Sequence, residues 1–239
     1  MKKHFGLIGE RLDYSFSPAY FFEKFKKLNI QALYEAVEVP QNHSLKAALK
    51  QRDWSGMNVT IPYKREIIPL LDSLSRSARE IGAVNTIQFS ENQLIGHNTD
   101  WIGFTESLPH NNFSKALILG NGGAHKAVLY ALKQMAIETC VVARNPKGND
   151  VPWTELKTLP IAQYDLVVNC TPTGTYPNVQ EAPDFPFEKI QSHQYFYDLI
   201  YNPDVTEFLK RAQNAGATIQ NGHKMLVLQA EASWEIWNS

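Results

Sequence analysis

A short apolar strand that runs into a glycine-rich loop constrains the fold of this chain more than any other feature. The run Ala116-Leu117-Ile118-Leu119 leads into Gly120-Asn121-Gly122-Gly123-Ala124 and then into a helical pattern. Gly120 permits a tight turn, Gly122 lets the backbone approach a pyrophosphate, and the N-terminus of the next helix offers free N–H groups. This order predicts a dinucleotide site in a Rossmann-type domain. The alternative is an ordinary strand-to-helix turn, and the generic fingerprint has a glycine or alanine where this chain has His125.

Apolar runs alternate with segments of helical period along the rest of the chain, as in a mostly parallel sheet covered by helices. A first α/β unit is predicted with strands at 4–9, 33–39, 57–60, 83–89 and 94–98, the last two joined by a hairpin turn at 90–93. After a polar break at 109–112, a second unit is predicted with strands at 116–119, 140–143, 166–170, 195–200 and 218–220. Helices are predicted from Ser17 as N-cap, over 44–52 and 64–71, from Ala124 and Thr206, and over 222–238, with only a weak signal at 154–159.

Composition and charge point to a small-molecule partner. The chain carries 23 basic and 24 acidic side chains, and no block of like charge would attract nucleic acid or an anionic membrane. No stretch approaches the ~18 apolar residues of a membrane span, and no apolar segment follows Met1-Lys2-Lys3, so we expect a cytoplasmic protein. Cys140 and Cys170 lie in apolar runs and are expected as buried thiols, and the histidines show no metal-ligand spacing, so no metal is expected.

The end of the strand after the glycine loop decides which dinucleotide binds. Arg144 follows Val141-Val142-Ala143, and no Asp or Glu lies between Thr139 and Asn149 to bind the ribose hydroxyls of NAD. An arginine fork at this position suits the extra phosphate of NADP. We therefore expect NADP as the cofactor. The alternative for Arg144 is a solvated loop charge.

Five polar segments, mostly at the ends of apolar strands, lie on both sides of the predicted dinucleotide unit in the sequence. This arrangement indicates an oxidoreductase that holds a small hydroxylated acid. The segments are Ser15-Phe16-Ser17-Pro18, Asn58-Val59-Thr60-Ile61-Pro62-Tyr63-Lys64, Gly82-Ala83-Val84-Asn85-Thr86, Asn98-Thr99-Asp100 and Gly222-His223-Lys224-Met225-Leu226 with Gln229. At these segments, and in the loop pattern G-x-G-G-A-x-x-A that ends at Ala127, the chain resembles the shikimate dehydrogenase family from Gly6 almost to its C-terminus.

The resemblance implies a two-domain enzyme of chorismate and aromatic amino acid biosynthesis. The expected reaction is the reversible, NADPH-dependent reduction of 3-dehydroshikimate to shikimate. The expected domains are a substrate domain at 1–101 with 222–239, to which the terminal helix returns, and an NADP-binding Rossmann-like domain at 102–221. We expect a monomer or a homodimer.

Lys64 and Asp100 are the candidate catalytic residues. Hydride transfer to a ketone leaves an oxyanion that must take a proton, so the site needs an acid within hydrogen-bond reach of that oxygen. In the resembled family the matching lysine and aspartate bracket the reacting hydroxyl, and the sequence leaves open which of them carries the proton. Taken singly, a surface lysine and a helix-capping aspartate are the plain structural alternatives.

The remaining candidates hold the substrate and the cofactor. Ser15 and Ser17 offer hydroxyl donors at a helix N-terminus for a carboxylate, although capping alone also explains Ser17. Expected contacts to ring hydroxyls come from Asn58, Thr60, Asn85 and Gln229, with Tyr201 near the substrate. The expected cofactor residues are Gly120, Gly122, Gly123, Ala124, Arg144, Asn169, Thr171 and Gly222. The family usually has glycine where this chain has Trp101, which puts catalytic efficiency and cofactor fit in question.

Three alternative functions share this architecture. A quinate/shikimate dehydrogenase that uses NAD is the nearest, although relatives that accept quinate tend to have threonine in place of Ser17. A catalytically silent dinucleotide-binding regulator is the second, and retention of Lys64 and Asp100 argues against it. A methylenetetrahydrofolate dehydrogenase would have no evident use for Ser15 and Ser17 as carboxylate donors.

Overall fold

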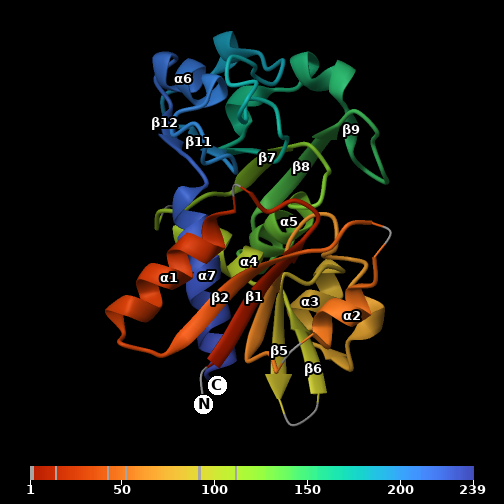
Figure 1. The fold of residues 1–239 in the computed structure, drawn as a ribbon. Coiled ribbons are helices and arrows are strands. Elements are labelled where there is room, and N and C mark those ends of the chain that lie inside the picture. The colour runs from red at the N-terminus through yellow and green to blue at the C-terminus, as the bar shows by residue number, and fades with distance from the viewer. Residues whose placement is uncertain (1–2, 14, 42, 52, 91–92, 111) are drawn as a thin grey trace. The chain divides into compact units, whose positions relative to one another are not determined.

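The computed structural model describes residues 3–13, 15–41, 43–51, 53–90, 93–110 and 112–239 and contains two compact units (Figure 1). Unit 1 comprises Met1–Ile102 and Gln229–Ser239, and unit 2 comprises Gly103–Leu228. Residues 222–228 therefore group with the second unit, whereas the sequence assigned them to the first. Two hydrogen bonds within unit 2 explain this difference, since the N–H of Gly222 donates to the carbonyl of Ile200 at 3.0 Å and Lys224 Nζ donates to the carbonyl of Ser107 at 3.2 Å.

The sheet of unit 1 is mixed and has the strand order β2-β1-β3-β5-β6-β4 in the described residues. Its strands are β1 (Lys3–Gly9), β2 (Ala32–Glu38), β3 (Gly56–Val59), β4 (Ser73–Leu74), β5 (Thr86–Ser90) and β6 (Gln93–His97). β1 runs parallel to β2 and β3, whereas β5 runs antiparallel to β3 and β6. The carboxyl ends of β3 and β6 and the start of β5 consequently meet at one edge. The predicted polar segments at Asn58 to Lys64, Asn85 and Asn98 to Asp100 all lie there.

Five α-helices or parts of α-helices belong to unit 1 in the described residues. They are α1 (Phe16–Lys27), α2 (Leu45–Leu49), α3 (Arg76–Ile81), the start of α4 (Asp100–Ser107) and the second part of α7 (His223–Trp237). Two of them, α1 and α7, pack on the sheet through aromatic side chains. Phe21 and Phe25 of α1 are buried with Phe5 and Trp237. A Cβ on Gly56 would lie 2.4 Å from the Trp237 ring, so only glycine at this position of β3 leaves room for the C-terminal helix.

Three local predictions for unit 1 are wrong. The predicted helix at 64–71 is a run of turns followed by a short 3₁₀ helix at Ile68–Leu70, because Pro69 lacks the N–H that an α-helix interior needs. The N-cap of α1 is Ser15 rather than Ser17, and its side chain makes no capping hydrogen bond. β5 begins at Thr86 rather than at residue 83, because Gly82, with a φ of 68°, is the C-cap of α3 and the chain needs the next residues to re-enter the sheet. Residues 91, 92, 111 and 52, at the predicted hairpin turn, polar break and helix end, lie outside the described residues.

Unit 2 contains an all-parallel sheet with the order β12-β11-β10-β7-β8-β9. Its strands are β7 (Lys115–Leu119), β8 (Glu138–Ala143), β9 (Val151–Pro152), β10 (Leu166–Asn169), β11 (Tyr195–Asp198) and β12 (Thr218–Gln220). Counted from β7, this is the doubly wound order 3-2-1-4-5-6, which confirms the predicted Rossmann-type unit. In such sheets ligands bind beyond the carboxyl ends of the strands where the order reverses, here between β7 and β10.

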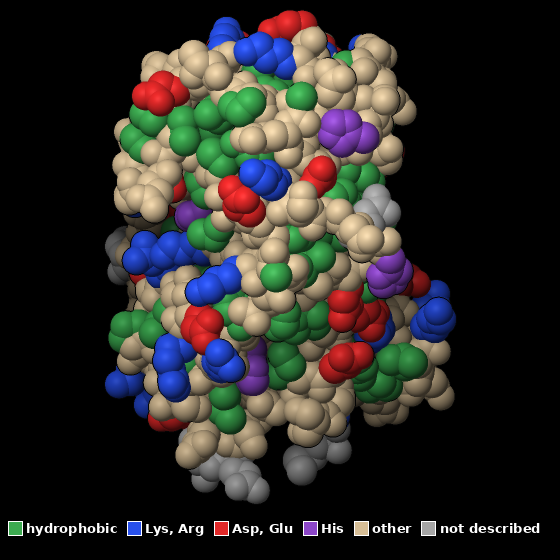
Figure 2. All heavy atoms as spheres, turned by 180° about the vertical axis from the view of Figure 1, so that it is seen from behind, with side chains coloured by type: hydrophobic (Ala, Val, Ile, Leu, Met, Phe, Trp, Pro, Cys, Tyr) green, Lys and Arg blue, Asp and Glu red, His purple; other side chains and the backbone are tan. Residues whose placement is uncertain are grey.

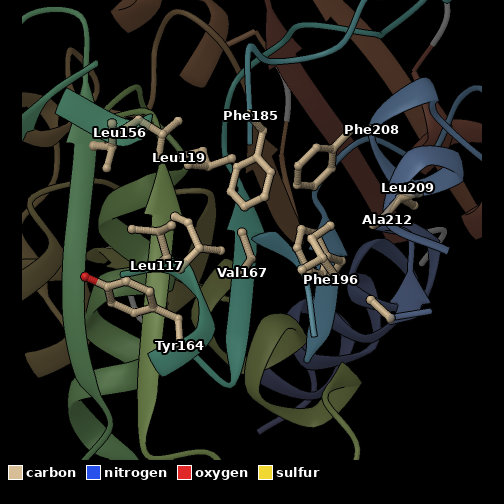
Figure 3. Close-up of a cluster of buried hydrophobic side chains, with 14 residues drawn as sticks. Leu117, Leu119, Leu156, Tyr164, Val167, Phe185, Phe196, Phe208, Leu209 and Ala212 are labelled. Atoms are coloured by element: carbon tan, nitrogen blue, oxygen red, sulfur yellow. The ribbon is translucent and has the colours of Figure 1, made fainter. Parts of the chain in front are cut away.

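One hydrophobic cluster of unit 2 lies on one face of this sheet (Figure 3). Leu117, Val167 and Phe196 come from neighbouring strands, and Phe185 and Phe208 cover them. The α-helices of the unit include α5 (His125–Gln134) and α6 (Glu207–Asn214), which begin near Ala124 and Thr206 as predicted, and the side chain of Thr206 caps α6. The weak helical signal at 154–159 corresponds to a 3₁₀ helix at Trp153–Thr158, so the crossover between β9 and β10, which the structure describes throughout, contains no α-helix.

Side chains of both charges occur on the face shown in Figure 2. Cys140 and Cys170 are free thiols, and burial raises the pKa of Cys170. Within the described part of the chain, no helix is long and apolar enough to cross a membrane. The same residues contain no cluster of three or more metal-ligating side chains.

Candidate functional site

Lys64 and Asp100 form an ion pair at the polar edge of the unit 1 sheet. Lys64 Nζ lies 2.7 Å from Asp100 Oδ2, and their side chains are 26% and 13% exposed. Lys64 lies in the turns after β3, where Pro62 has taken the chain out of the sheet, and Asp100 begins α4. The two candidate catalytic residues, 36 positions apart in the sequence, are therefore in direct contact and remain accessible to a ligand.

Asn85 holds the other oxygen of Asp100. Its Nδ2 donates to Asp100 Oδ1 at 2.9 Å and lies 3.4 Å from Gln229 Oε1, and its Oδ1 accepts the N–H of Thr99 at 2.7 Å. The N–H of Asp100 in turn donates to Asn98 Oδ1 at 3.1 Å. Both carboxylate oxygens of Asp100 thus have donors, which fixes the orientation of the ion pair. Asn85, Asp100 and Gln229 come together as a predicted set.

Asn58 lies next to this group, but its amide forms hydrogen bonds to other side chains of the protein. Its Oδ1 accepts the hydroxyl of Tyr34 at 2.8 Å, and its Nδ2 lies 3.0 Å from Ser233 Oγ and 3.1 Å from Thr86 Oγ1. Asn58 is only 5% exposed. The amide is therefore placed to order the floor of the site, and the expected direct contact between Asn58 and a substrate stays a prediction.

Ser15, Ser17 and Thr60 lie around the same edge and differ in burial and in their hydrogen bonds. Ser17 is buried in the first turn of α1 and hydrogen-bonds Tyr34, whose pKa burial raises. Ser15 is half-buried at the N-cap, and its hydroxyl makes no capping bond. Thr60 is half-buried, and its N–H donates to the carbonyl of Ile8 at 2.8 Å. The hydroxyl of Ser15 at the start of α1 is thus available to an anion.

A cavity of about 370 Å³ lies at the carboxyl ends of the unit 2 strands. It is lined by Gly120, Asn121 and Gly122 after β7, by Arg144 and Asn145 after β8, and by Cys170, Thr171, Pro172 and Thr173 after β10, together with Trp153 and Ala182, Pro183 and Asp184. These are the strand ends that flank the reversal of strand order. The predicted glycine loop, Arg144 and Thr171 are therefore brought to one cavity, although they are spread over 52 positions of sequence.

The glycine loop has the open backbone that a pyrophosphate requires. Gly120 has a φ of 94°, and a Cβ there would lie 2.8 Å from Thr171 Cγ2. A Cβ built on Gly122 or Gly123 meets no atom within 4 Å, so the space over the loop is free. Ala124 is the N-cap of α5, whose first N–H groups and positive dipole end suit an anion. His125, the departure from the generic fingerprint, places its Nδ1 against the carbonyl of Gly122.

Asn169, Thr171 and Asp198 form a buried network beneath the cavity. Asn169 Oδ1 accepts the hydroxyl and the N–H of Thr171, at 2.7 and 3.0 Å, and its Nδ2 donates to Asp198 Oδ1 at 3.0 Å. Burial raises the pKa of the Asp198 carboxyl to about 6. Asn169 is fully buried, so it shapes the Thr171 turn, while its expected direct role in cofactor binding stays a prediction.

Tyr201 and Gly222 lie in unit 2, Tyr201 after the end of β11 and Gly222 after the end of β12. A Cβ on Gly222 would lie 2.1 Å from the carbonyl oxygen of Leu199, which gives this glycine a packing reason independent of any ligand. Tyr201 is 38% exposed. The predicted roles of both residues stay predictions.

Sequence reasoning missed Tyr34, Ser233 and Asp150. Tyr34 and Ser233 join Thr86 and Thr99, which belong to the predicted polar segments, in the hydroxyl network around Asn58 and Asn85. Tyr34 and Ser233 lie in segments whose patterns are those of an ordinary strand and an amphipathic helix, so no local signal marks them. Asp150, just beyond the acid-free stretch, lies 3.0 Å from the side chain of Asn121, and only the fold of the loop brings it there.

The sequence matches the family model described as the shikimate dehydrogenase substrate binding domain over residues 7–87. A shikimate dehydrogenase (NADP(+)) from Clostridium botulinum is 39% identical over 246 residues, which cover 97% of this chain and 95% of the relative. A shikimate 5-dehydrogenase from Thermus thermophilus, solved in complex with NADP(H) and shikimate, is 32% identical with a TM-score of 0.87, covering 98% of this chain and 93% of that one. A quinate dehydrogenase from Corynebacterium glutamicum in complex with NAD is 27% identical with a TM-score of 0.86, covering 99% and 93%.

Proposed function

The chain belongs to the shikimate dehydrogenase family, and on that premise we propose that it catalyses the reversible, NADPH-dependent reduction of 3-dehydroshikimate to shikimate. The observation that carries the proposal is the accessible ion pair of Lys64 and Asp100, with 2.7 Å between Nζ and Oδ2. A catalytically silent nucleotide sensor would have no need for this pair, because it transfers no proton.

Lys64 is the proton donor in the proposed reaction. Reduction of the ketone adds a hydride to carbon, which NADPH supplies when bound, and a proton to oxygen. Both oxygens of Asp100 accept hydrogen bonds, from Lys64 and from Asn85, so the carboxylate holds Nζ of Lys64 in a fixed position. Asp100 orients the ammonium toward the developing oxyanion, and Asn85 keeps the carboxylate in place. In the reverse direction the neutral lysine takes the proton from the hydroxyl.

Ser15 and Ser17 bind the substrate carboxylate at the start of α1. This role is supported by the helix N-terminus, whose free N–H groups attract anions, and by the Ser15 hydroxyl, which makes no capping bond. Thr60, Asn85 and Gln229 hydrogen-bond the ring hydroxyls. A site of this kind rejects analogues that lack a hydroxyl, because its buried polar groups would be left unpaired.

NADP binds the unit 2 cavity in this proposal. Gly120, Gly122 and Gly123 leave the backbone free for the pyrophosphate, and Arg144 lines the same cavity and supplies the charge for the 2′-phosphate. The second candidate is a quinate dehydrogenase that uses NAD, since one such enzyme shares the fold. The arginine after β8 favours NADP over that alternative.

A spectrophotometric cross of shikimate and quinate against NADP and NAD tests the proposal on the purified protein. We expect the pair shikimate and NADP to give the highest kcat/KM. Preferred turnover of quinate with NAD would support the second candidate. Binding of NADP without turnover of either acid would identify a regulator and refute the proposed activity.

A further inference from the structure

The side chain of Asn121 joins the glycine loop to the loop that follows β8. Its Nδ2 donates to the carbonyl of Asn145 at 2.8 Å and to Asp150 Oδ2 at 3.0 Å. Asp150 Oδ2 also accepts the N–H of Lys147 at 3.1 Å, and the N–H of Asp150 donates to the carbonyl of Lys147 at 3.1 Å. The loop between β8 and β9 is therefore closed on itself and tied to the glycine loop by one amide group.

Arg144 begins this tied loop. It lines the cavity together with Asn121, whereas Asp150 is not among the described residues that line it. The carboxylate of Asp150 thus accepts hydrogen bonds from Asn121 and from the N–H of Lys147. The cation that lines the cavity next to the glycine loop is the guanidinium of Arg144. An arginine on an unrestrained loop has many rotamers and backbone positions, and it loses this conformational entropy when it binds a phosphate. A fixed loop backbone lowers that entropy cost and so strengthens phosphate binding.

We propose that Asn121 is a positioning residue that sets the preference for NADP, because it holds the Arg144 loop where the guanidinium meets the 2′-phosphate. This inference rests on the proposed function. Asn121 should therefore strengthen binding of the 2′-phosphate only, and it should not change the affinity for the parts that NADP and NAD share. A direct contact between Asn121 and the pyrophosphate would instead affect both cofactors equally.

The test is calorimetric binding of NADP+ and NAD+ to the full chain and to Asn121→Ala, Arg144→Ala and the double variant. For Asn121→Ala we expect the Kd of NADP+ to rise about fivefold, the value of one hydrogen bond, while the Kd of NAD+ stays within about twofold. In the Arg144→Ala background, Asn121→Ala should have no further effect on either Kd, because the residue acts through the arginine.

Asp150→Ala, which removes one of the two acceptors of Asn121, should give a smaller loss of the same selectivity, and it serves if Asn121→Ala does not fold. Asn178→Ala, at an exposed asparagine of the same unit, is the matched control and should leave both Kd values unchanged. Equal weakening of NADP+ and NAD+, or additive losses in the double variant, would overturn the inference. Failure of the unaltered protein to prefer NADP+ would refute the proposed cofactor instead, so the two failures are distinguishable.

Discussion

Replacement of Asp198 by Asn should make the stability of this protein less sensitive to pH. Asp198 is fully buried and accepts hydrogen bonds from the Thr206 hydroxyl at 2.6 Å, from the Ile200 N–H at 3.1 Å and from Asn169 Nδ2 at 3.0 Å. Burial nevertheless raises the pKa of its carboxyl from 3.8 to about 6. Because the folded-state pKa exceeds the unfolded one, the native state binds more protons between about pH 4 and pH 6, and stability falls as the pH rises through that window.

The magnitude follows from the two pKa values. A rise from 3.8 to about 6 corresponds to about 3 kcal/mol at neutral pH, and to a change of roughly 2 kcal/mol between pH 4.5 and pH 8. An asparagine keeps the acceptor oxygen for Asn169 and Ile200 and donates to Thr206, but it does not ionise. The free energy of unfolding of Asp198→Asn minus that of the wild type should therefore increase by roughly 2 kcal/mol over this range.

Urea unfolding followed by circular dichroism at pH 4.5, 6 and 8 measures this difference. Asp53→Asn, at an exposed aspartate, controls for the general effect of one carboxylate less. A difference that stays flat or decreases with rising pH would refute the reasoning, because it would mean that the fold does not disfavour the ionised Asp198.

Further predictions concern ligand binding and packing. Arg144→Ala should lower kcat/KM for NADP at least tenfold relative to NAD, since a lost charge-assisted phosphate contact is worth about 1.5 to 3 kcal/mol; unchanged preference in steady-state kinetics would contradict this. Ser15→Ala and Ser17→Ala should each weaken shikimate binding in calorimetry. Ser15→Ala should leave the melting temperature unchanged because the Ser15 hydroxyl makes no capping hydrogen bond. Unaltered affinity in both variants would show that the serines do not bind the substrate. Gly222→Ala should lower the melting temperature strongly, because its Cβ would lie 2.1 Å from the Leu199 carbonyl oxygen. Gly122→Ala has free space around its Cβ, so it should fold normally but bind NADP+ less tightly. Similar melting temperatures of the two variants would contradict the packing argument.

The sequence predicts most of the fold because the apolar runs of the second unit are unambiguous. Leu117, Val142 and Val167 belong to buried parallel strands, whose continuous apolar character follows from cover on both faces. The helix predicted at 64–71 does not form because Pro69 lacks the N–H that an α-helix interior needs, although the apolar spacing of the segment is helical. Ser15 and Ser17 both suit a helix N-terminus, and which of them becomes the N-cap depends on how α1 packs on β1 and β2.

The candidate site could be predicted only in part. Lys64, Asn85 and Asp100 lie next to strand ends, so their association follows from the order of the sheet. Tyr34 and Asp150 could not be found in the same way. Tyr34 joins the site across strands that are distant in sequence, and Asp150 is brought to Asn121 by a loop whose path no periodicity records.

The kcat of Lys64→Ala tests the proposed role of Lys64 as the proton donor in the reduction of 3-dehydroshikimate. Steady-state kinetics with shikimate and NADP, with circular dichroism to confirm folding, should show a kcat lower by roughly 10²- to 10⁴-fold and a shikimate KM within a few-fold of the wild type. A folded Lys64→Ala variant with a near-normal kcat would contradict this role, because proton transfer would then belong to another group.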